Sequence, residues 1–114
     1  MKAVASELLK MLPGKFTDQW PMGERFVHAF SHGTMSVEFY APVGSDPQTP
    51  HTQDELYFIF SGAGEFVMAG ERYSFGPGTA FFVPAGVEHR FENFTPDFST
   101  WVVFWGPQGG ERIA

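Results

Sequence analysis

The sequence predicts an all-β domain, and three observations support this fold class. Eight short segments rich in apolar and aromatic residues follow one another between residues 25 and 105. Turn sequences separate them, and the 114-residue chain has thirteen glycines and nine prolines, which suit tight turns better than a helical bundle. Fourteen phenylalanines indicate a wide apolar interior, a buried subunit interface or both. Short strands at this spacing favour a sandwich or a barrel, and the length suggests one domain over residues 1–114.

The expected elements can be placed in order along the chain. Residues 3–12 contain good helix formers and Pro13-Gly14 is a stop signal, so we expect a short N-terminal helix or arm over residues 1–14. The barrel core is expected over about residues 24–105, and a polar tail over residues 106–114. Strands are expected at 25–30, 34–41, 55–61, 65–68, 71–75, 79–84, 89–91 and 100–105, with a long loop at 42–50.

Two of the expected strands are apolar on both faces. Successive side chains of a strand point to opposite sides, yet residues 56–60 and 101–105 are apolar throughout. One set of side chains can fill the barrel, and the other must be covered by a second sheet or a second subunit. A homodimer is therefore expected, although two packed sheets in one chain would also account for the pattern.

Composition excludes several kinds of function. The net charge is −6 and the seven basic residues are not clustered, which argues against a nucleic-acid partner. The chain has no cysteine, which excludes disulfides, thiolate nucleophiles and cysteine metal sites and suits a reducing cytoplasm. Charged residues interrupt the N-terminal segment as a secretory signal would not allow, and no apolar run is long enough to span a bilayer. We expect a cytoplasmic protein with no membrane partner.

The second half of the chain contains a motif that places a histidine. Residues 78–93 read GTAFFVPAGVEHRFEN, which has the form G-x5-P-x-G-x2-H-x3-N. Pro84 and Gly86 turn the chain so that His89 returns into the barrel. This segment resembles the second motif of the cupin family at every fixed position.

The first half resembles the other cupin motif, G-x5-H-x-H-x3–4-E-x6-G, with two departures. His51 takes the position of the second histidine, Glu55 that of the glutamate and Gly62 that of the closing glycine. Thr49 stands where the first histidine would be, and Gly44 is one residue away from the position of the leading glycine. The sequence looks like a small, stand-alone bacterial cupin.

The resemblance implies a fold and a metal site. The fold would be a double-stranded β-helix, or jelly-roll, barrel with a short N-terminal helix. One divalent metal ion would be held by His51, Glu55 and His89, a two-imidazole, one-carboxylate set typical of Fe(II) oxygenases. Iron, manganese, nickel and zinc all suit these ligands, and Gln53 or Thr49 could add a weak oxygen ligand.

A metal site with these ligands requires the backbone to bend. His51 and Glu55 are four residues apart, so in a straight strand their Cα atoms would lie about 13 Å apart. Donor atoms of one metal site lie about 2 Å from the ion. The backbone must therefore bend between Thr52 and Asp54. Asp54 would then point away from Glu55, as a turn or surface residue or as the partner of an arginine.

Further residues are candidates around the metal. Tyr57 lies on the Glu55 side of its strand, and Tyr57 or Gln53 is expected to hold or move a proton as a catalytic residue. Glu38 faces either the cavity or solvent. His28 is expected in the core or at the rim, and His32 in an exposed turn.

Several functions are compatible with such a site, because fold resemblance does not determine chemistry. The leading hypothesis is a metal-dependent enzyme, and specifically a dioxygenase, that acts on a small organic molecule. A non-catalytic module that binds a metal or small ligand is the alternative. A third hypothesis is an isomerase, an epimerase or a lyase. A sugar-phosphate substrate ranks lower, because only Arg25, Arg72 and Arg90 are near enough to line a basic pocket.

Overall fold

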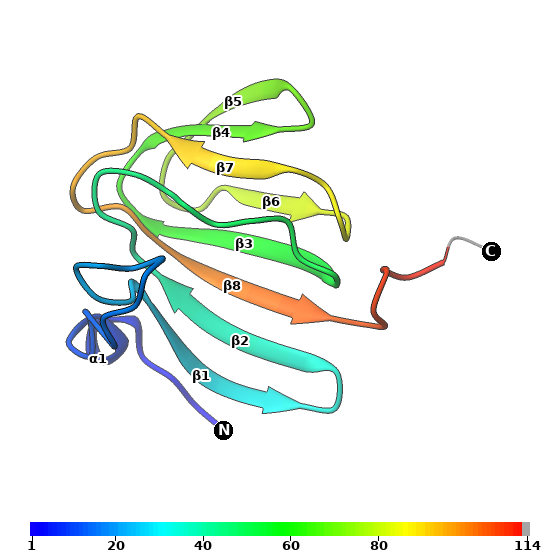
Figure 1. The fold of residues 1–114 in the computed structure, drawn as a ribbon, viewed down its shortest axis with the longest axis horizontal. Coiled ribbons are helices and arrows are strands. Elements are labelled where there is room, and N and C mark those ends of the chain that lie inside the picture. The colour runs from blue at the N-terminus through cyan, green and yellow to red at the C-terminus, as the bar shows by residue number, and fades with distance from the viewer. Residues whose placement is uncertain (113–114) are drawn as a thin grey trace.

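A computed structural model describes residues 1–112 and shows that this part of the chain is almost entirely β (Figure 1). Each strand expected from the sequence is present, with ends that shift by at most two residues. The strands are β1 (Phe26–His32), β2 (Met35–Tyr40), β3 (Asp54–Ser61), β4 (Gly64–Met68), β5 (Glu71–Phe75), β6 (Ala80–Val83), β7 (His89–Glu92) and β8 (Ser99–Trp105).

The N-terminal helix α1 (Ala5–Leu9) is shorter than the expected segment. The chain leaves the helix in a turn before Pro13, in keeping with the restriction that a proline places on the residue before it. Ala5 and Leu8 are buried against Phe39 of β2, so the helix lies on the five-stranded sheet. Among the described residues, no helix is long and apolar enough to cross a membrane.

The strands form two antiparallel sheets that face each other. One has the order β1-β2-β8-β3-β6 and the other β5-β4-β7. Aromatic rings fill the space between the two sheets. The ring centroid of Tyr57 on β3 lies 4.9 Å from that of Phe91 on β7, and the centroid of Phe91 lies 4.8 Å from that of Phe66 on β4. This arrangement confirms the double-stranded β-helix, although strand pairing among the described residues does not join the two sheets into a closed barrel.

The other face of the five-stranded sheet remains partly uncovered. Tyr57 and Ile59 point inward and are buried, whereas Phe58 is 46% exposed and Phe60 48% exposed. Phe82 on the neighbouring β6 is also 48% exposed. The second sheet thus covers one apolar face of β3, and α1 covers only part of the opposite one.

The long segment between β2 and β3 crosses over to the three-stranded sheet and returns (Figure 1). Asp46 fastens it there, because its carboxylate accepts hydrogen bonds from the backbone N–H of Phe91 at 2.8 Å and from the hydroxyl of Tyr40 at 2.5 Å. The side-chain amide of Gln48 also donates to Asp46, at 2.8 Å. The segment that leads to His51 is therefore held between both sheets.

Candidate metal centre

The backbone bends where the metal site requires it. The chain turns at Thr52 and Gln53, and β3 begins only at Asp54, which confirms the expected bend. The backbone N–H of Gly86 donates to the carbonyl of His51 at 2.7 Å, which ties His51 to the turn that precedes His89.

Asp54 has a different role from the surface position or arginine pair expected of it. Its side chain is buried, and its carboxylate accepts hydrogen bonds from the backbone N–H groups of Ala85 and Glu111, each at 3.0 Å. Asp54 thereby connects the start of β3 to the turn before His89 and to the segment after β8.

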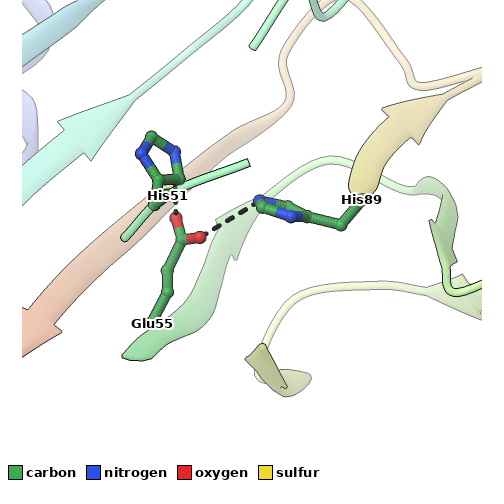
Figure 2. A group of neighbouring side chains, drawn as sticks. All are labelled: His51, Glu55 and His89. Atoms are coloured by element: carbon green, nitrogen blue, oxygen red, sulfur yellow. Dashed lines mark ion pairs between the residues drawn. The ribbon is translucent and has the colours of Figure 1, made fainter. Parts of the chain in front are cut away.

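His51, Glu55 and His89 come together as expected (Figure 2). One potential ligand atom from each lies within 4.8 Å of the others. The carboxylate of Glu55 lies between the two rings: Oε1 is 3.0 Å from His89 Nε2, and Oε2 is 4.0 Å from His51 Nε2. Residues from the loop before β3, the start of β3 and the start of β7 thus converge on one point.

The buried carboxylate of Glu55 is the most unusual feature of this group. Its side chain is 1% exposed, and neither oxygen has a hydrogen-bond partner among the described residues. The close contact with His89 Nε2 lacks hydrogen-bond geometry. A buried carboxylate without hydrogen-bond partners is costly by several kcal/mol, and a cation at this point would offset that cost. The donor set and the burial therefore fit a divalent metal ion.

The surroundings of the two histidines orient one ring and shift the two pKa values in opposite directions. His89 Nδ1 lies 2.8 Å from the carbonyl of Val87, a contact that orients the ring and leaves Nε2 directed at Glu55. Burial lowers the pKa of His51, which favours the neutral form that binds metals. Burial also lowers the pKa of His89, but the Glu55 carboxylate and the Val87 carbonyl raise it, and the net shift is upward.

Tyr57 lies beside this group, on the side of β3 that was expected. Its hydroxyl lies 3.1 Å from His89 Nε2 and donates to the side-chain oxygen of Gln48 at 3.1 Å. Burial and the nearby charge of Glu55 raise the pKa of Tyr57 well above its usual value. The hydroxyl is therefore protonated at neutral pH and can act as a donor.

Gln48 is a site residue that the sequence did not reveal. Its oxygen accepts from Tyr57 and lies 3.5 Å from His51 Nε2. The motif spacing drew attention to Thr49, which lines the adjoining cavity. Gln53 is not brought to the group, because its amide donates to the carbonyls of Thr34 at 3.1 Å and Gly106 at 2.9 Å.

A cavity of about 310 Å³ opens from His51 and Glu55. Glu38 faces this cavity, which was one of its two expected positions. The remaining lining residues are Gln19, Trp20, Phe26, Tyr40, Gln48, Thr49, Val102 and Phe104. His28 and His32 are exposed and lie outside the group of His51, Glu55 and His89, so His28 is not in the core, and His32 ends β1 instead of lying in the turn.

Comparison with known proteins identifies relatives of this arrangement. Residues 36–105 match the family model of the cupin domain. An uncharacterized protein of Streptomyces coelicolor is 41% identical over 76 residues, which cover 65% of this chain and 72% of the relative. A Cupin 2 conserved barrel domain protein from Salinispora arenicola superposes with a TM-score of 0.61 at 23% identity, over 71% of this chain and 74% of that one. The DMSP lyase DddQ from Ruegeria pomeroyi also gives a TM-score of 0.61, at 26% identity, over 73% of this chain and 48% of the lyase.

Proposed function

Because the chain belongs to the cupin family, we propose that it binds one divalent metal ion through His51, Glu55 and His89 and uses it to act on a small organic molecule. The observation that carries the proposal is the fully buried carboxylate of Glu55, which lacks hydrogen-bond partners and lies between two imidazoles. Two imidazoles and one carboxylate leave coordination positions open, and iron, manganese, nickel and zinc all suit them.

The protein's own groups would divide the remaining tasks. A divalent metal held by His51, Glu55 and His89 would supply Lewis acidity toward an oxygen atom of the substrate. Tyr57 holds a proton beside His89, and Gln48 orients the Tyr57 hydroxyl. Val102 and Phe104 give the cavity an apolar wall that keeps water away from the substrate. In this proposal Tyr57 is a catalytic residue and Gln48 a positioning residue.

Two reaction classes are favoured by specific observations. The ligand set is typical of Fe(II) oxygenases, so a dioxygenase is the leading candidate. The similarity to a DMSP lyase favours a lyase as the second. A sugar-phosphate isomerase fits less well, because Arg72 and Arg90 pair with Glu65 and Glu92 and do not line the cavity.

We also propose that two copies of the chain associate through the outer face of the five-stranded sheet. That face exposes Phe58, Phe60 and Phe82, and α1 covers part of it. An exposed apolar patch on a small domain is typical of an interaction site. A cytoplasmic location, expected from the absence of cysteine, stays a prediction.

Metal analysis tests the proposal. The protein is loaded with each metal in turn and unbound metal is removed. The wild type is expected to retain about one ion per chain. His89→Ala is expected to lose the ion, because removal of one of the three proposed ligands leaves a weak site. His32→Ala is the matched control, since His32 is an exposed residue at the end of β1 and lies outside the group of His51, Glu55 and His89. Equal metal retention in wild type and His89→Ala would contradict the site.

The same loaded proteins distinguish the reaction classes. Oxygen consumption by the iron-loaded protein with a panel of enols, catechols and thiols would support the dioxygenase. Product release without oxygen would support the lyase. Metal retention without turnover in either assay would support the alternative of a non-catalytic binding module.

A further inference from the structure

The cavity beside the proposed metal centre contains a second carboxylate. Glu38 lies on β2 opposite His28 of β1 and Val102 of β8 in the strand register, and its side chain lines the same cavity as Glu55. No ion pair within the described part of the chain involves Glu38. Burial raises the pKa of Glu38, and the nearby His28 lowers it only in part. The Glu38 carboxyl therefore has no ion-pair partner within the described part of the chain, and a bound cation would stabilise its ionised form.

Aromatic rings surround the same end of the cavity. Trp20, Phe26 and Tyr40 all line it. The ring centroid of Trp20 lies 6.1 Å from that of Phe26, with an angle of 63° between the ring planes. It also lies 6.1 Å from the centroid of Tyr40, with an interplanar angle of 79°. Because the rings meet edge to face, their π-faces point in different directions around this end of the cavity. Aromatic faces attract cations through the negative charge of their π-electrons, and a nearby carboxylate adds to that attraction.

The lining offers nothing that would attract an anion at this end. None of the lining residues is a lysine or an arginine. Arg25 precedes Phe26 in the chain, but its Nε donates to the carbonyl of Ala41 at 2.8 Å and its side chain borders a different pocket. The whole chain carries a net charge of −6, which also favours the approach of cations.

We propose that the Glu38 end of the cavity binds the cationic head group of the ligand, an alkylated ammonium group held between the carboxylate and the rings of Trp20 and Tyr40. The inference rests on the proposed function and specifies its substrate class. An oxygen donor at one end of the ligand would face His51 and Glu55, and the cationic group would lie at the other end. A small zwitterion or amino alcohol satisfies both requirements in a cavity of about 310 Å³.

Three probes of nearly equal shape test this inference by calorimetric titration. Choline carries the cation, 3,3-dimethylbutan-1-ol replaces its nitrogen by carbon, and 3,3-dimethylbutanoate carries a negative charge instead. Choline is expected to bind about tenfold more tightly than the alcohol, a difference that one desolvated cation site can supply. Glu38→Gln is expected to abolish that preference. Glu71→Gln, an exposed change on the other sheet, should leave it intact.

Each titration is performed on metal-free and on metal-loaded protein. A choline preference in the metal-free protein supports the cation site even if metal analysis contradicts the proposed function. Conversely, one retained metal per chain with equal binding of choline and the alcohol overturns the cation site alone. No detectable choline binding, preference for the anion, or an unchanged preference in Glu38→Gln would each overturn it as well. Trp20→Leu, checked for an unchanged melting temperature, should weaken choline more than the alcohol.

Discussion

Asp46 shows how a single buried side chain can support the candidate metal centre without touching it. Its carboxylate accepts hydrogen bonds from Tyr40, Gln48 and the backbone of Phe91. Gln48 in turn accepts from Tyr57, whose hydroxyl lies beside His89. The position of the Tyr57 hydroxyl therefore depends on a residue two hydrogen bonds away.

Asp46→Ala is expected to lower the free energy of unfolding by about 3 kcal/mol, because it leaves buried donors without an acceptor. Urea unfolding followed by tryptophan fluorescence measures the change. Asp18→Ala, an exposed loop change, is the control and should stay within about 0.5 kcal/mol of wild type. Equal stability of the two variants would show that the Asp46 hydrogen bonds contribute little.

The convergence of His51, Glu55 and His89 could be predicted from the sequence because these residues stand in motifs with fixed spacing. His89 follows a turn made by Pro84 and Gly86, and the bend before β3 follows from the distance between His51 and Glu55. Gln48 could not be predicted, because an irregular loop has no period that tells which side chains point inward. Gln53 was placed near the metal by its spacing alone, and the bend turns it outward to Thr34.

The turn between β3 and β4 explains why the first motif closes on a glycine. Gly62 has a φ of +83°, and a Cβ atom there would lie 2.5 Å from Phe98 Cα and 2.8 Å from Phe98 N. Both atoms belong to the backbone next to β8, so they cannot move aside without displacing the strand. Gly70 in the β4–β5 turn has a similar φ of +81° but open space around it.

This pair of glycines separates backbone strain from steric clash. Gly70→Ala should cost about 1 kcal/mol, the cost of a left-handed conformation alone. Gly62→Ala should cost about 4 kcal/mol, because it adds a backbone clash. Thermal unfolding of both variants checks the difference, and similar melting temperatures would mean that the β3–β4 turn relaxes freely.

Strands were easier to predict than the helix. The nearly unbroken apolar run of β3 and the turns around it define its ends within one residue. The helix α1 kept only Ala5–Leu9 of residues 3–12, since a short isolated helix depends on packing, and only Ala5 and Leu8 are buried in it.

At the scale of the whole molecule, the apolar outer face of the five-stranded sheet remains to be explained. Phe58 of β3 pairs in register with Trp101 of β8 and Ala80 of β6, so it lies well inside the sheet and not at its edge. It is nevertheless 46% exposed in a single chain. A second copy placed on this face would cover it.

The wild-type protein is expected to be a dimer, and Phe58→Glu to be a monomer, because a charge at the centre of an apolar interface is costly to bury. Size-exclusion chromatography with light scattering measures both masses. Phe16→Glu, the same change at a loop residue that is 72% exposed, should leave the dimer intact. A monomeric wild type would contradict this assembly.

The place of β8 between β2 and β3 has a consequence for how the chain folds as it is made. During synthesis β2 and β3 both emerge before β8, and each lacks one of its two neighbours in the sheet until residues 99–105 arrive. Pairing over such long stretches of chain is slow, because loop-closure entropy is lost before contacts form. The half-built sheet would expose its phenylalanines meanwhile, so the yield of folded protein should depend on temperature and on chaperones more than its small size suggests.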